Sequence, residues 1–361
     1  MFKNPFKDPL LIFLAGLALG VKLFSLFPEA VEQRYTNGLY PYFSTGLRVL
    51  LGWIPFSVGD LLYFAASLYF IYLLYRALVV LRAKGFSKVL LARGVVKCFK
   101  ILLILYIWFN ALWGLNYNRL GIAHQLELEL QPYTLEEVTA LAHDLQQQLN
   151  LYAAQADSTQ KWDAMDRLQH AAVGTYQNAQ KHYPYLQYRQ PTLKPSLYTH
   201  VGHYFGFTGY YNPFTGEAQV KTTIPHFIKP FVALHEVAHQ LGYAKENEAN
   251  FVAFLSGKHS GDAAVLYSMY YELFRYALRE VAYLDTAVAA AFKARLHPRV
   301  LRDNEALKAY LLSTQNKIEP LMSFFYDRFL KANNQAEGVQ TYNRVVALLV
   351  AYRKKFGSPA I

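Results

Sequence analysis

The chain is poor in cysteine: Cys98 is the one cysteine among its 361 residues. A single thiol excludes an intramolecular disulfide, so cysteine pairing indicates neither the compartment nor the source of stability. It also excludes a multi-cysteine zinc site, because such sites use several thiolates. Any zinc ion that this protein binds must therefore be held by histidine and carboxylate side chains.

Charged residues are scarce too, at 17% of the chain, whereas apolar residues make up 53%. Because a soluble domain carries about 25% charged residues, this balance favours a protein that lies partly in lipid. The net charge of +11 fits either a nucleic acid or an anionic membrane surface as partner. Six basic residues crowd between two apolar runs: Arg82, Lys84, Lys88, Arg93, Lys97 and Lys100. This distribution indicates membrane topology, so we expect a lipid bilayer and no nucleic acid among the partners.

Three apolar runs precede residue 120, at residues 10–27, 61–81 and 101–115. A transmembrane helix needs about 20 apolar residues, and a cleaved signal peptide is the alternative for the first run. Basic residues lie at the N-terminus and between the second and third runs, which the positive-inside rule assigns to the cytoplasm. We therefore predict a multi-pass protein of the cytoplasmic (inner) membrane. Residues 1–118 would form an anchor with three transmembrane helices, and residues 119–361 an extracytoplasmic domain.

The loop between the first two runs, residues 35–60, is apolar but interrupted by Pro55 and Gly59. These breaks favour a re-entrant or interfacial segment over a further span. A full span here would invert the predicted topology and place the domain in the cytoplasm.

The rest of the chain predicts an α+β fold that is mostly helical and carries a small sheet. Thr134 followed by Glu137 forms a capping box that opens a helix. Residues 188–223 combine Gly and Pro with Tyr, Phe, Thr and Val, which is typical of strands and tight turns. A hairpin is expected there, with its second strand over residues 217–222. Residues 261–356 are predicted to form an amphipathic, helical C-terminal part.

A His-Glu-x-x-His run carries the strongest indication of chemistry, and it lies on a predicted amphipathic helix. Residues i and i+4 project from the same face of a helix, so His235 and His239 can direct two imidazoles at one zinc ion. Glu236 lies beside that ion. There it can take a proton from zinc-bound water and pass it to a leaving amine. The run therefore predicts a hydrolytic Zn²⁺ site.

A catalytic zinc site uses three protein ligands and keeps one position open, so the sequence must supply a third ligand. Gly242 ends the helix and allows the chain to reverse, which brings a second helix back towards the first. On that helix Glu246 is predicted to bind zinc, and Asn250 to hydrogen-bond a ligand histidine. Glu248, on the opposite face, is the alternative ligand. The whole metal site is expected within residues 230–255.

The stretches HEVAHQLG and ENEAN resemble the gluzincin pattern of zinc metallopeptidases, HExxH followed by Glu-x-x-x-Asp. This resemblance implies a zincin-like domain with peptidase activity. The chain departs from the pattern because Asn250 replaces the aspartate and the gap from His239 to Glu246 is short. More broadly, the chain resembles an uncharacterised bacterial membrane family, the domain of unknown function 3810. The matching stretches run through nearly the whole chain: IPFSVGDLLY, GYYNPFTGEAQV, HEVAHQLG, ENEANF and FLKANNQAEG.

Other polar residues are candidates for supporting roles. The mechanism needs a hydrogen-bond donor, opposite the zinc, that stabilises the tetrahedral oxyanion. For each candidate the alternative is a purely structural role. The candidates are Tyr211, Tyr342 and Arg344. His200 and His203 form an H-x-x-H pair, for which ordinary hydrogen-bonded loop histidines are expected rather than metal ligands. Residues 217–220 are predicted to be the edge strand that binds an extended substrate.

These features predict a membrane-anchored zinc metallohydrolase, a peptidase that uses zinc-activated water with Glu236 as general base. Its substrate would be a peptide or protein of the cell envelope. The alternative is a non-catalytic, zinc-stabilised envelope protein that binds a partner or cell-wall material. A transporter or assembly factor with an incidental motif is the third hypothesis. An intramembrane protease is not expected, because it requires an apolar run of spanning length around the motif and this chain has none there. The sequence specifies neither the substrate nor the oligomeric state.

Overall fold

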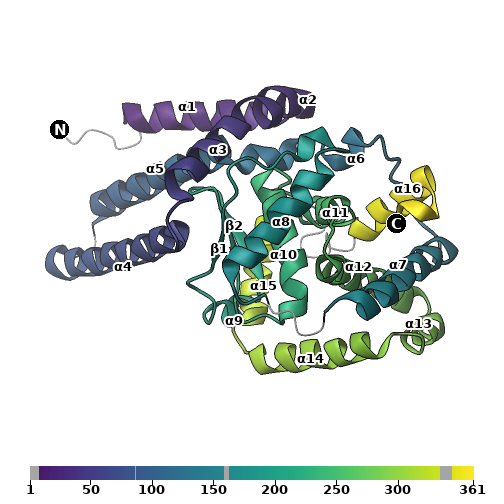
Figure 1. Cartoon of the computed structure of the whole chain (residues 1–361). Helices are drawn as coiled ribbons and strands as arrows, with labels where there is room; N and C mark the ends of the chain where they lie inside the picture. Colours follow the sequence, from purple (N-terminus) through teal and green to yellow (C-terminus); the bar gives the residue numbers. More distant parts are fainter. Residues whose placement is uncertain (1–7, 86, 158–161, 334–343) are drawn as a thin grey trace.

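A computed structural model of the chain describes residues 8–85, 87–157, 162–333 and 344–361 (Figure 1). Most of them are helical, and three short strands form one sheet, so the predicted mostly helical α+β fold is confirmed. The α-helices are α1 (Pro9–Phe24), α2 (Pro28–Ala30), α3 (Tyr40–Leu51), α4 (Val58–Lys84), α5 (Lys88–Leu112), α6 (Ile122–Gln125), α7 (Leu135–Gln155), α8 (Met165–Ala179), α9 (Gly202–Phe205), α10 (Lys229–Gln240), α11 (Glu246–Gly257), α12 (Ala263–Leu284), α13 (Thr286–Lys293), α14 (Pro298–Thr314), α15 (Glu319–Ala332) and α16 (Arg344–Phe356). A π-helix, Val31–Leu39, joins α2 to α3.

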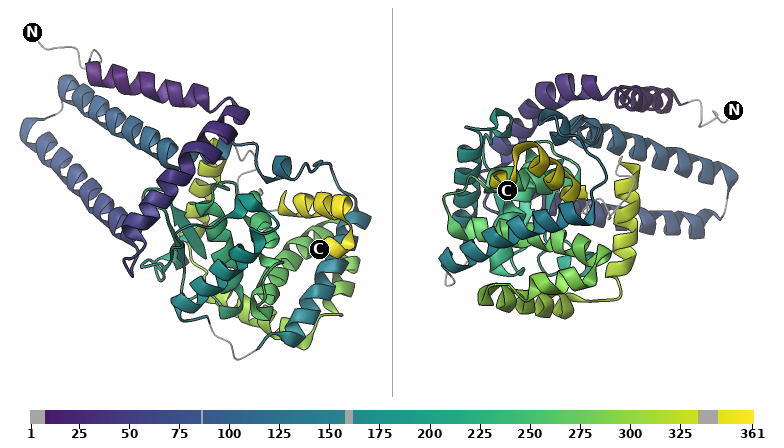
Figure 2. Two further views of the ribbon diagram at one scale, coloured as in Figure 1. Left: turned by 45° about the horizontal axis from the view of Figure 1, so that its top comes forward. Right: turned by 90° about the vertical axis from the view of Figure 1, so that its right-hand side faces the viewer.

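Beyond its N-terminal end, helix α4 stands clear of the rest of the molecule. Among the described helices it is the one that is by itself long and apolar enough to cross a membrane, over Val58–Ala83 with a mean hydropathy of 1.9. None of the residues in its apolar window is buried in the protein. A helix that is apolar all round needs an apolar surrounding, because contact with water costs about 25 cal/mol per Å² of apolar surface. Helices α4 and α5 project from the body on the side where the N-terminal end of α1 also lies (Figures 1 and 2).

The expectation of three transmembrane helices is wrong. Helix α1 ends at Phe24 after 16 residues, short of the length of about 20 that a span needs. It qualifies only together with Pro28–Leu51, across a bend of 97°. In α5 the basic residues expected in a loop form the first half of the helix itself: Lys88, Arg93, Lys97 and Lys100. The described part of the chain therefore has one candidate span, or two when the bent pair counts as one.

The sheet is small and lies against α10. Its strands are β1 (Leu193–Pro195), β2 (Gly209–Asn212) and β3 (Glu217–Val220), in the order β1-β3-β2. Strands β2 and β3 form the predicted hairpin, with Tyr211 opposite Ala218, whereas β1 pairs with β3 in parallel. The prediction that residues 217–220 form an edge strand is wrong, because β3 is the central strand. The free edge on the hairpin side belongs to β2.

The body is held together by a hydrophobic core shared by α7, α8, α10, α11, α12 and α16. Helix α7 begins at the predicted capping box, in which Thr134 and Glu137 each accept a hydrogen bond from the other's backbone N–H. It buries Leu141, Leu145 and Leu149 and packs along α12. Burial of each such side chain contributes roughly 1.5–3 kcal/mol before conformational entropy is subtracted. Helices α10 and α11 are buried over almost their whole length, so they support functional side chains rigidly.

The N-terminal end of α4 is fastened to the sheet. The Glu217 carboxylate of β3 is fully buried and accepts hydrogen bonds from the N–H groups of Val58 and Gly59, at 3.1 and 2.6 Å. Lys194 of β1 forms an ion pair with the same carboxylate. A carboxylate at a helix N-terminus satisfies unpaired N–H groups and complements the helix dipole. The candidate membrane helix is therefore joined to the central strand of the sheet.

The segment expected to be re-entrant or interfacial, residues 35–60, spans the end of the π-helix, α3 and the start of α4. Several of its polar side chains are buried against the body, among them Tyr40, Ser44 and Arg48. The hydroxyls of Tyr40 and Ser44 donate to the carbonyl of Gln240, at 2.9 and 3.1 Å. These bonds satisfy a carbonyl at the C-terminal end of α10, where a helix has no partners of its own. The segment thus supports α10 directly.

Candidate metal centre

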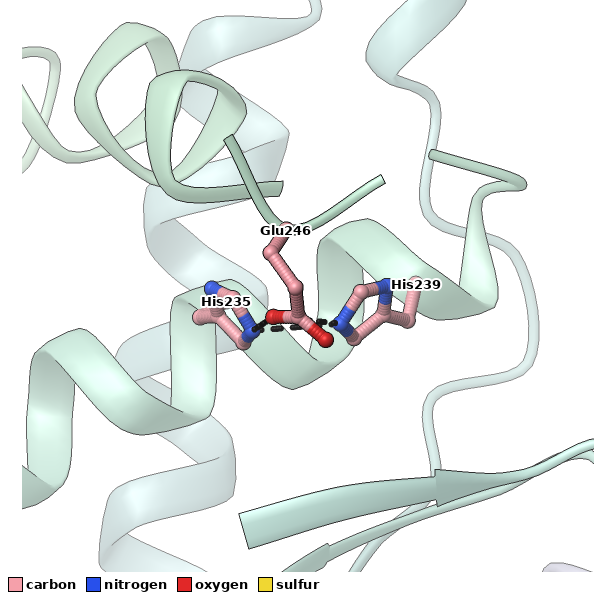
Figure 3. Close-up of side chains that lie close together, drawn as sticks. All are labelled: His235, His239 and Glu246. Carbon is pink, nitrogen blue, oxygen red and sulfur yellow. Dashed lines mark hydrogen bonds and ion pairs between the residues drawn. The ribbon is translucent and has the colours of Figure 1, made fainter. Parts of the chain in front are cut away.

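Helices α10 and α11 are joined by a tight turn that places one above the other. Gly242 in this turn has a φ of +87°, a left-handed conformation that glycine adopts without strain. A side chain there would also meet the ring of Tyr40 and the amide of Asn116. Arg119 donates to the carbonyl of Gly242 at 3.2 Å. The turn allows α11 to begin at Glu246, whose side chain points down at α10 (Figure 3).

Three side chains converge between the two helices. His235 and His239 project from successive turns of α10, and Glu246 points between them from α11 (Figure 3). The two Nε2 atoms are 3.1 Å apart, and Glu246 Oε2 lies 3.2 Å from His235 Nε2 and 3.7 Å from His239 Nε2. Ligand atoms at 2.0–2.1 Å from a tetrahedral zinc ion are about 3.4 Å apart. The three donor atoms therefore have the spacing of a zinc site.

The hydrogen bonds of the two histidines orient their lone pairs towards this centre. The Nδ1–H of His239 donates to the carbonyl of Tyr243 at 2.7 Å, and the Nδ1–H of His235 donates to Asn250 Oδ1 at 2.8 Å. Each neutral ring then has its lone pair on Nε2. Two lone pairs that face each other at 3.1 Å repel unless a cation or a proton lies between them. The donor set thus fits a metal ion held by two imidazoles and one carboxylate.

Glu246 is ionised and held in place from a distant helix. The phenol of Tyr326, on α15, donates to Glu246 Oε1 at 2.6 Å, which leaves Oε2 towards the histidines. Burial would raise the pKa of the Glu246 carboxyl, but the close approach of the His235 and His239 imidazoles outweighs it and holds the pKa well below its usual range. A carboxylate in this state is ready to bind a cation. Among the described residues, these three form the one cluster of His, Cys, Asp or Glu that could hold a metal ion.

Glu236 lies on the sheet side of α10. Its side chain is buried, and its Oε2 atom has no hydrogen-bond partner. Burial raises the pKa of the Glu236 carboxyl to about 7, opposed by His235 and His239 and reinforced by Glu246. A Cβ added to Gly209 at the start of β2 would lie 2.6 Å from Glu236 Oε1, so the carboxylate touches the β2 backbone. A carboxyl group with a pKa near neutral pH can both accept and donate a proton, which suits general acid–base chemistry.

The C-terminal end of α5 contacts the metal helix as well. Trp113, directly after α5, donates its indole N–H to the carbonyl of His239 at 3.2 Å. Its ring also meets the His239 ring edge-on, with centroids 6.0 Å apart. The centre is therefore bounded by the helices of the body and by the end of the projecting helix pair.

Comparison with known protein families identifies the family of this chain. The model of a family described as a protein of unknown function, DUF3810, matches residues 35–350. The chain belongs to the DUF3810 family. No curated protein and no solved structure matches this DUF3810 chain significantly. The family match runs from the π-helix into α16 and so includes both α10 and α11. The zincin-like assignment continues to depend on the motif and its geometry.

The structure separates the two candidate third ligands of this DUF3810 protein. Glu246 lies with the histidines, whereas Glu248 points to the other side of α11. There Glu248 Oε1 lies 3.2 Å from Lys245 Nζ, and its carboxylate packs against Gly121. Asn250 contacts His235 as expected for a residue that orients a ligand. Glu246 is therefore the geometric choice for the third ligand, and the metal itself stays a prediction.

The remaining candidates have other surroundings. Tyr211 is buried beside Trp113, and its hydroxyl lies 3.4 Å from that of Tyr40, so it contributes to packing. Arg344 is exposed at the start of α16, and Tyr342 lies outside the described residues. His203 accepts a hydrogen bond from Lys221 at 3.2 Å. Neither His200 nor His203 belongs to the described metal-binding cluster.

Sequence reasoning missed Tyr326, Trp113 and the α3 residues that support α10. Tyr326 is 80 residues away from Glu246, and nothing local to either residue predicts their contact. Tyr40 and Ser44 follow a helical spacing of i and i+4 in the apolar segment before α4. Two hydroxyls on one face of an apolar helix indicate a polar partner. That spacing was the one signal available for the supporting residues.

The residues that orient the ligands should set zinc affinity. We expect Asn250→Ala and Tyr326→Phe each to weaken zinc binding by about 10–100-fold, because each removes a hydrogen bond that holds a ligand atom in position. Competition with a chromophoric chelator measures the affinity. Tyr133→Phe removes a phenol that binds Glu280, away from the centre, and should leave the affinity unchanged. Unaltered zinc affinity in both orienting variants would contradict the assignment of the centre.

Proposed function

We propose that this DUF3810 protein is a membrane-anchored zinc metallohydrolase that cleaves peptide bonds. The observation that supports this most strongly is the convergence of His235, His239 and Glu246, with both imidazole lone pairs directed at one point. Beside them Glu236 presents a buried oxygen without a hydrogen-bond partner. Three ligands with an adjacent carboxylate are the composition of a catalytic zinc site.

Each residue has a definite part in this proposal. His235, His239 and Glu246 hold the ion, which when bound acts as a Lewis acid that acidifies water and polarises a carbonyl. Glu236 takes a proton from the attacking water and delivers it to the amine nitrogen as the C–O bond forms and the C–N bond breaks. The raised pKa of Glu236, about 7, suits a group that both accepts and returns a proton.

Strand β2 is the proposed binding edge for an extended substrate. It replaces residues 217–220 in that role, because β3 is central and its backbone groups are paired on both sides. Gly209 at the start of β2 touches Glu236, so a peptide aligned along this edge would pass beside the general base. Backbone pairing at a sheet edge binds peptides of varied sequence, and the side-chain pockets then determine specificity.

The site is proposed to work beside a membrane. Ser57, before α4, and Trp113, after α5, both contact the body. A hairpin whose two ends meet the same body must enter and leave a bilayer from the same side. With α4 in lipid, α5 would have to lead the chain back although it is not by itself a candidate span, and the basic residues in its first half and near the α4–α5 connection would face the cytoplasm. The metal centre then lies outside the cytoplasmic membrane, where a peptide or protein of the cell envelope is the substrate.

A non-catalytic, zinc-stabilised envelope protein is the competing hypothesis. A structural zinc site has four protein ligands and is closed. The cluster here offers three ligand side chains among the described residues, together with Glu236 directed at the sheet edge. This composition favours hydrolysis over a purely structural role.

Metal analysis of the purified full chain in detergent tests the proposal. We expect about one zinc ion per chain in the wild type, and loss of most of it after dialysis in Glu246→Ala, which removes one of three ligands. Glu248→Ala is the matched control, since it removes a neighbouring carboxylate that points away, and it should retain zinc. Circular dichroism checks that both variants are folded. A folded wild type without zinc, or equal zinc loss in both variants, would refute the site.

A further inference from the structure

A cavity of about 600 Å³ lies between the end of the sheet and helices α9, α12, α14 and α15. Its charged and titratable lining is mostly basic. The side chains concerned are His203, Lys221, Arg275, Lys308 and Glu319. Arg275 is already paired with Glu272 at 2.8 Å, whereas Lys308 is exposed at the mouth. The cavity therefore has room and charge for an anionic group.

Lys221 is the unusual member of this lining. Its side chain is 2% exposed, and its Nζ lies 3.2 Å from His203 Nδ1 and 5.5 Å from the centre of the Tyr310 ring. The two other buried lysines of the described chain, Lys194 and Lys229, each form an ion pair with a carboxylate. Among the residues that the structure describes, no carboxylate lies within ion-pair distance of Lys221. A buried charge without a counter-ion is costly.

The charge of Lys221 persists at neutral pH. Burial lowers the pKa of the Lys221 ammonium to about 8, so most molecules keep the proton at pH 7. Burial and the neighbouring Lys221 lower the pKa of His203 as well, which keeps that imidazole neutral as the acceptor. The pair therefore presents one desolvated positive charge to the cavity.

The cavity adjoins the proposed catalytic carboxylate. Lys221 follows β3, and its backbone N–H donates to the carbonyl of Thr208 at 2.9 Å. Thr208 is part of the cavity wall, and the next residue, Gly209, touches Glu236. One residue of extended chain covers about 3.3 Å. A substrate that lies along β2 beside Glu236 would therefore place a neighbouring side chain at the cavity mouth.

We propose that this cavity receives an oxyanion group of the substrate, a carboxylate or a phosphate, with buried Lys221 as its counter-charge. The proposal deepens the proposed function and depends on it for the identity of the substrate. A cavity of this kind would make the protein selective for acidic or phosphorylated peptides. Lys308 at the rim would add attraction that salt screens, whereas Lys221 would provide a desolvated, charge-assisted hydrogen bond.

Peptide binding tests this selectivity. Three fluorescein-labelled heptapeptides, identical except for Glu, phosphoserine or Gln at the centre, are titrated by fluorescence anisotropy into the full chain in detergent. The Glu236→Gln background prevents cleavage during the measurement. We expect the Glu or the phosphoserine peptide to bind about 10-fold or more tightly than the Gln peptide. Preference between the two anionic peptides distinguishes a carboxylate from a phosphate.

Variants assign the preference to the cavity. Lys221→Met should abolish it, Lys221→Arg should keep a part of it, and Lys308→Gln, on the exposed rim, should reduce it a few-fold. Lys181→Met is the matched control, because Lys181 is exposed on the surface and is not part of the lining. Equal affinity for the three peptides, or a preference that survives in folded Lys221→Met, overturns the proposal.

Measurements with a chelator distinguish failure of the cavity proposal from failure of the proposed metallohydrolase function. The anionic preference should persist in EDTA, because Lys221 and not the metal provides it. Preference without zinc binding would support the cavity and refute the metallohydrolase. Zinc-dependent cleavage without any preference would support the metallohydrolase and refute the cavity.

Discussion

Glu236→Gln is expected to keep zinc bound and to lower peptide hydrolysis by about 10²–10⁴-fold, the usual contribution of general acid–base catalysis. Glutamine has the size of glutamate but accepts no proton, so water activation and protonation of the leaving amine are both lost. Zinc binding should persist because Glu236 is not among the three clustered ligand atoms. Cleavage of a mixture of fluorogenic peptides and zinc content are measured on the same preparation.

Glu305→Gln is the matched control for this prediction. Glu305 is exposed on α14, and its loss should change neither zinc content nor cleavage. Full activity of Glu236→Gln would refute the general base. Zinc loss in the same variant would instead make Glu236 a ligand, so the two readouts together assign its role.

The local features of the centre could be predicted from the sequence. The spacing of His235 and His239 on a helix, the left-handed Gly242 and the contact between Asn250 and His235 all depend on residues within 15 positions of one another. Helix geometry and the conformational freedom of glycine determine such arrangements. The capping box that opens α7 belongs to the same class of features.

The non-local features could not be predicted. A hairpin pattern indicates that β2 and β3 pair, but it does not indicate that β1 adds to β3 and makes it central. The same limit applies to Tyr326, which binds Glu246 from a helix 80 residues away. Partners of this kind are set by how helices pack, and packing depends on the whole core.

The prediction of three transmembrane helices was wrong because the apolar runs did not indicate where the helices begin and end. The run at residues 10–27 is apolar enough, but α1 ends at Phe24 and the chain then bends by 97°. Hydropathy reports composition within a window and does not indicate the break in the helix that precedes Pro28. The run in α4 differs, because its apolar residues form one unbroken helix that is long enough to be a candidate span.

Glu217→Leu is expected to lower the free energy of unfolding by about 3–5 kcal/mol, the cost of leaving one member of a buried ion pair unpaired. The Lys194 and Glu217 side chains are 4% and 0% exposed, so Lys194 would keep a buried charge without its carboxylate. The same substitution removes the acceptor for two N–H groups at the start of α4. Urea unfolding in detergent, followed by tryptophan fluorescence, measures the change.

Two further variants separate the buried charge from the loss of contacts. Adding Lys194→Met to Glu217→Leu should restore much of the stability, because apolar groups of similar volume often replace a buried pair at little cost. Lys355→Met breaks an ion pair in which Glu127 is 87% exposed, and it should cost less than about 1 kcal/mol. A double variant no more stable than Glu217→Leu would show that the N–H groups of α4, and not Lys194, are what the carboxylate stabilises. In either case Glu217 joins the candidate membrane helix to the strand that leads to Lys221 and its cavity, so its loss should also weaken the selectivity for anionic peptides.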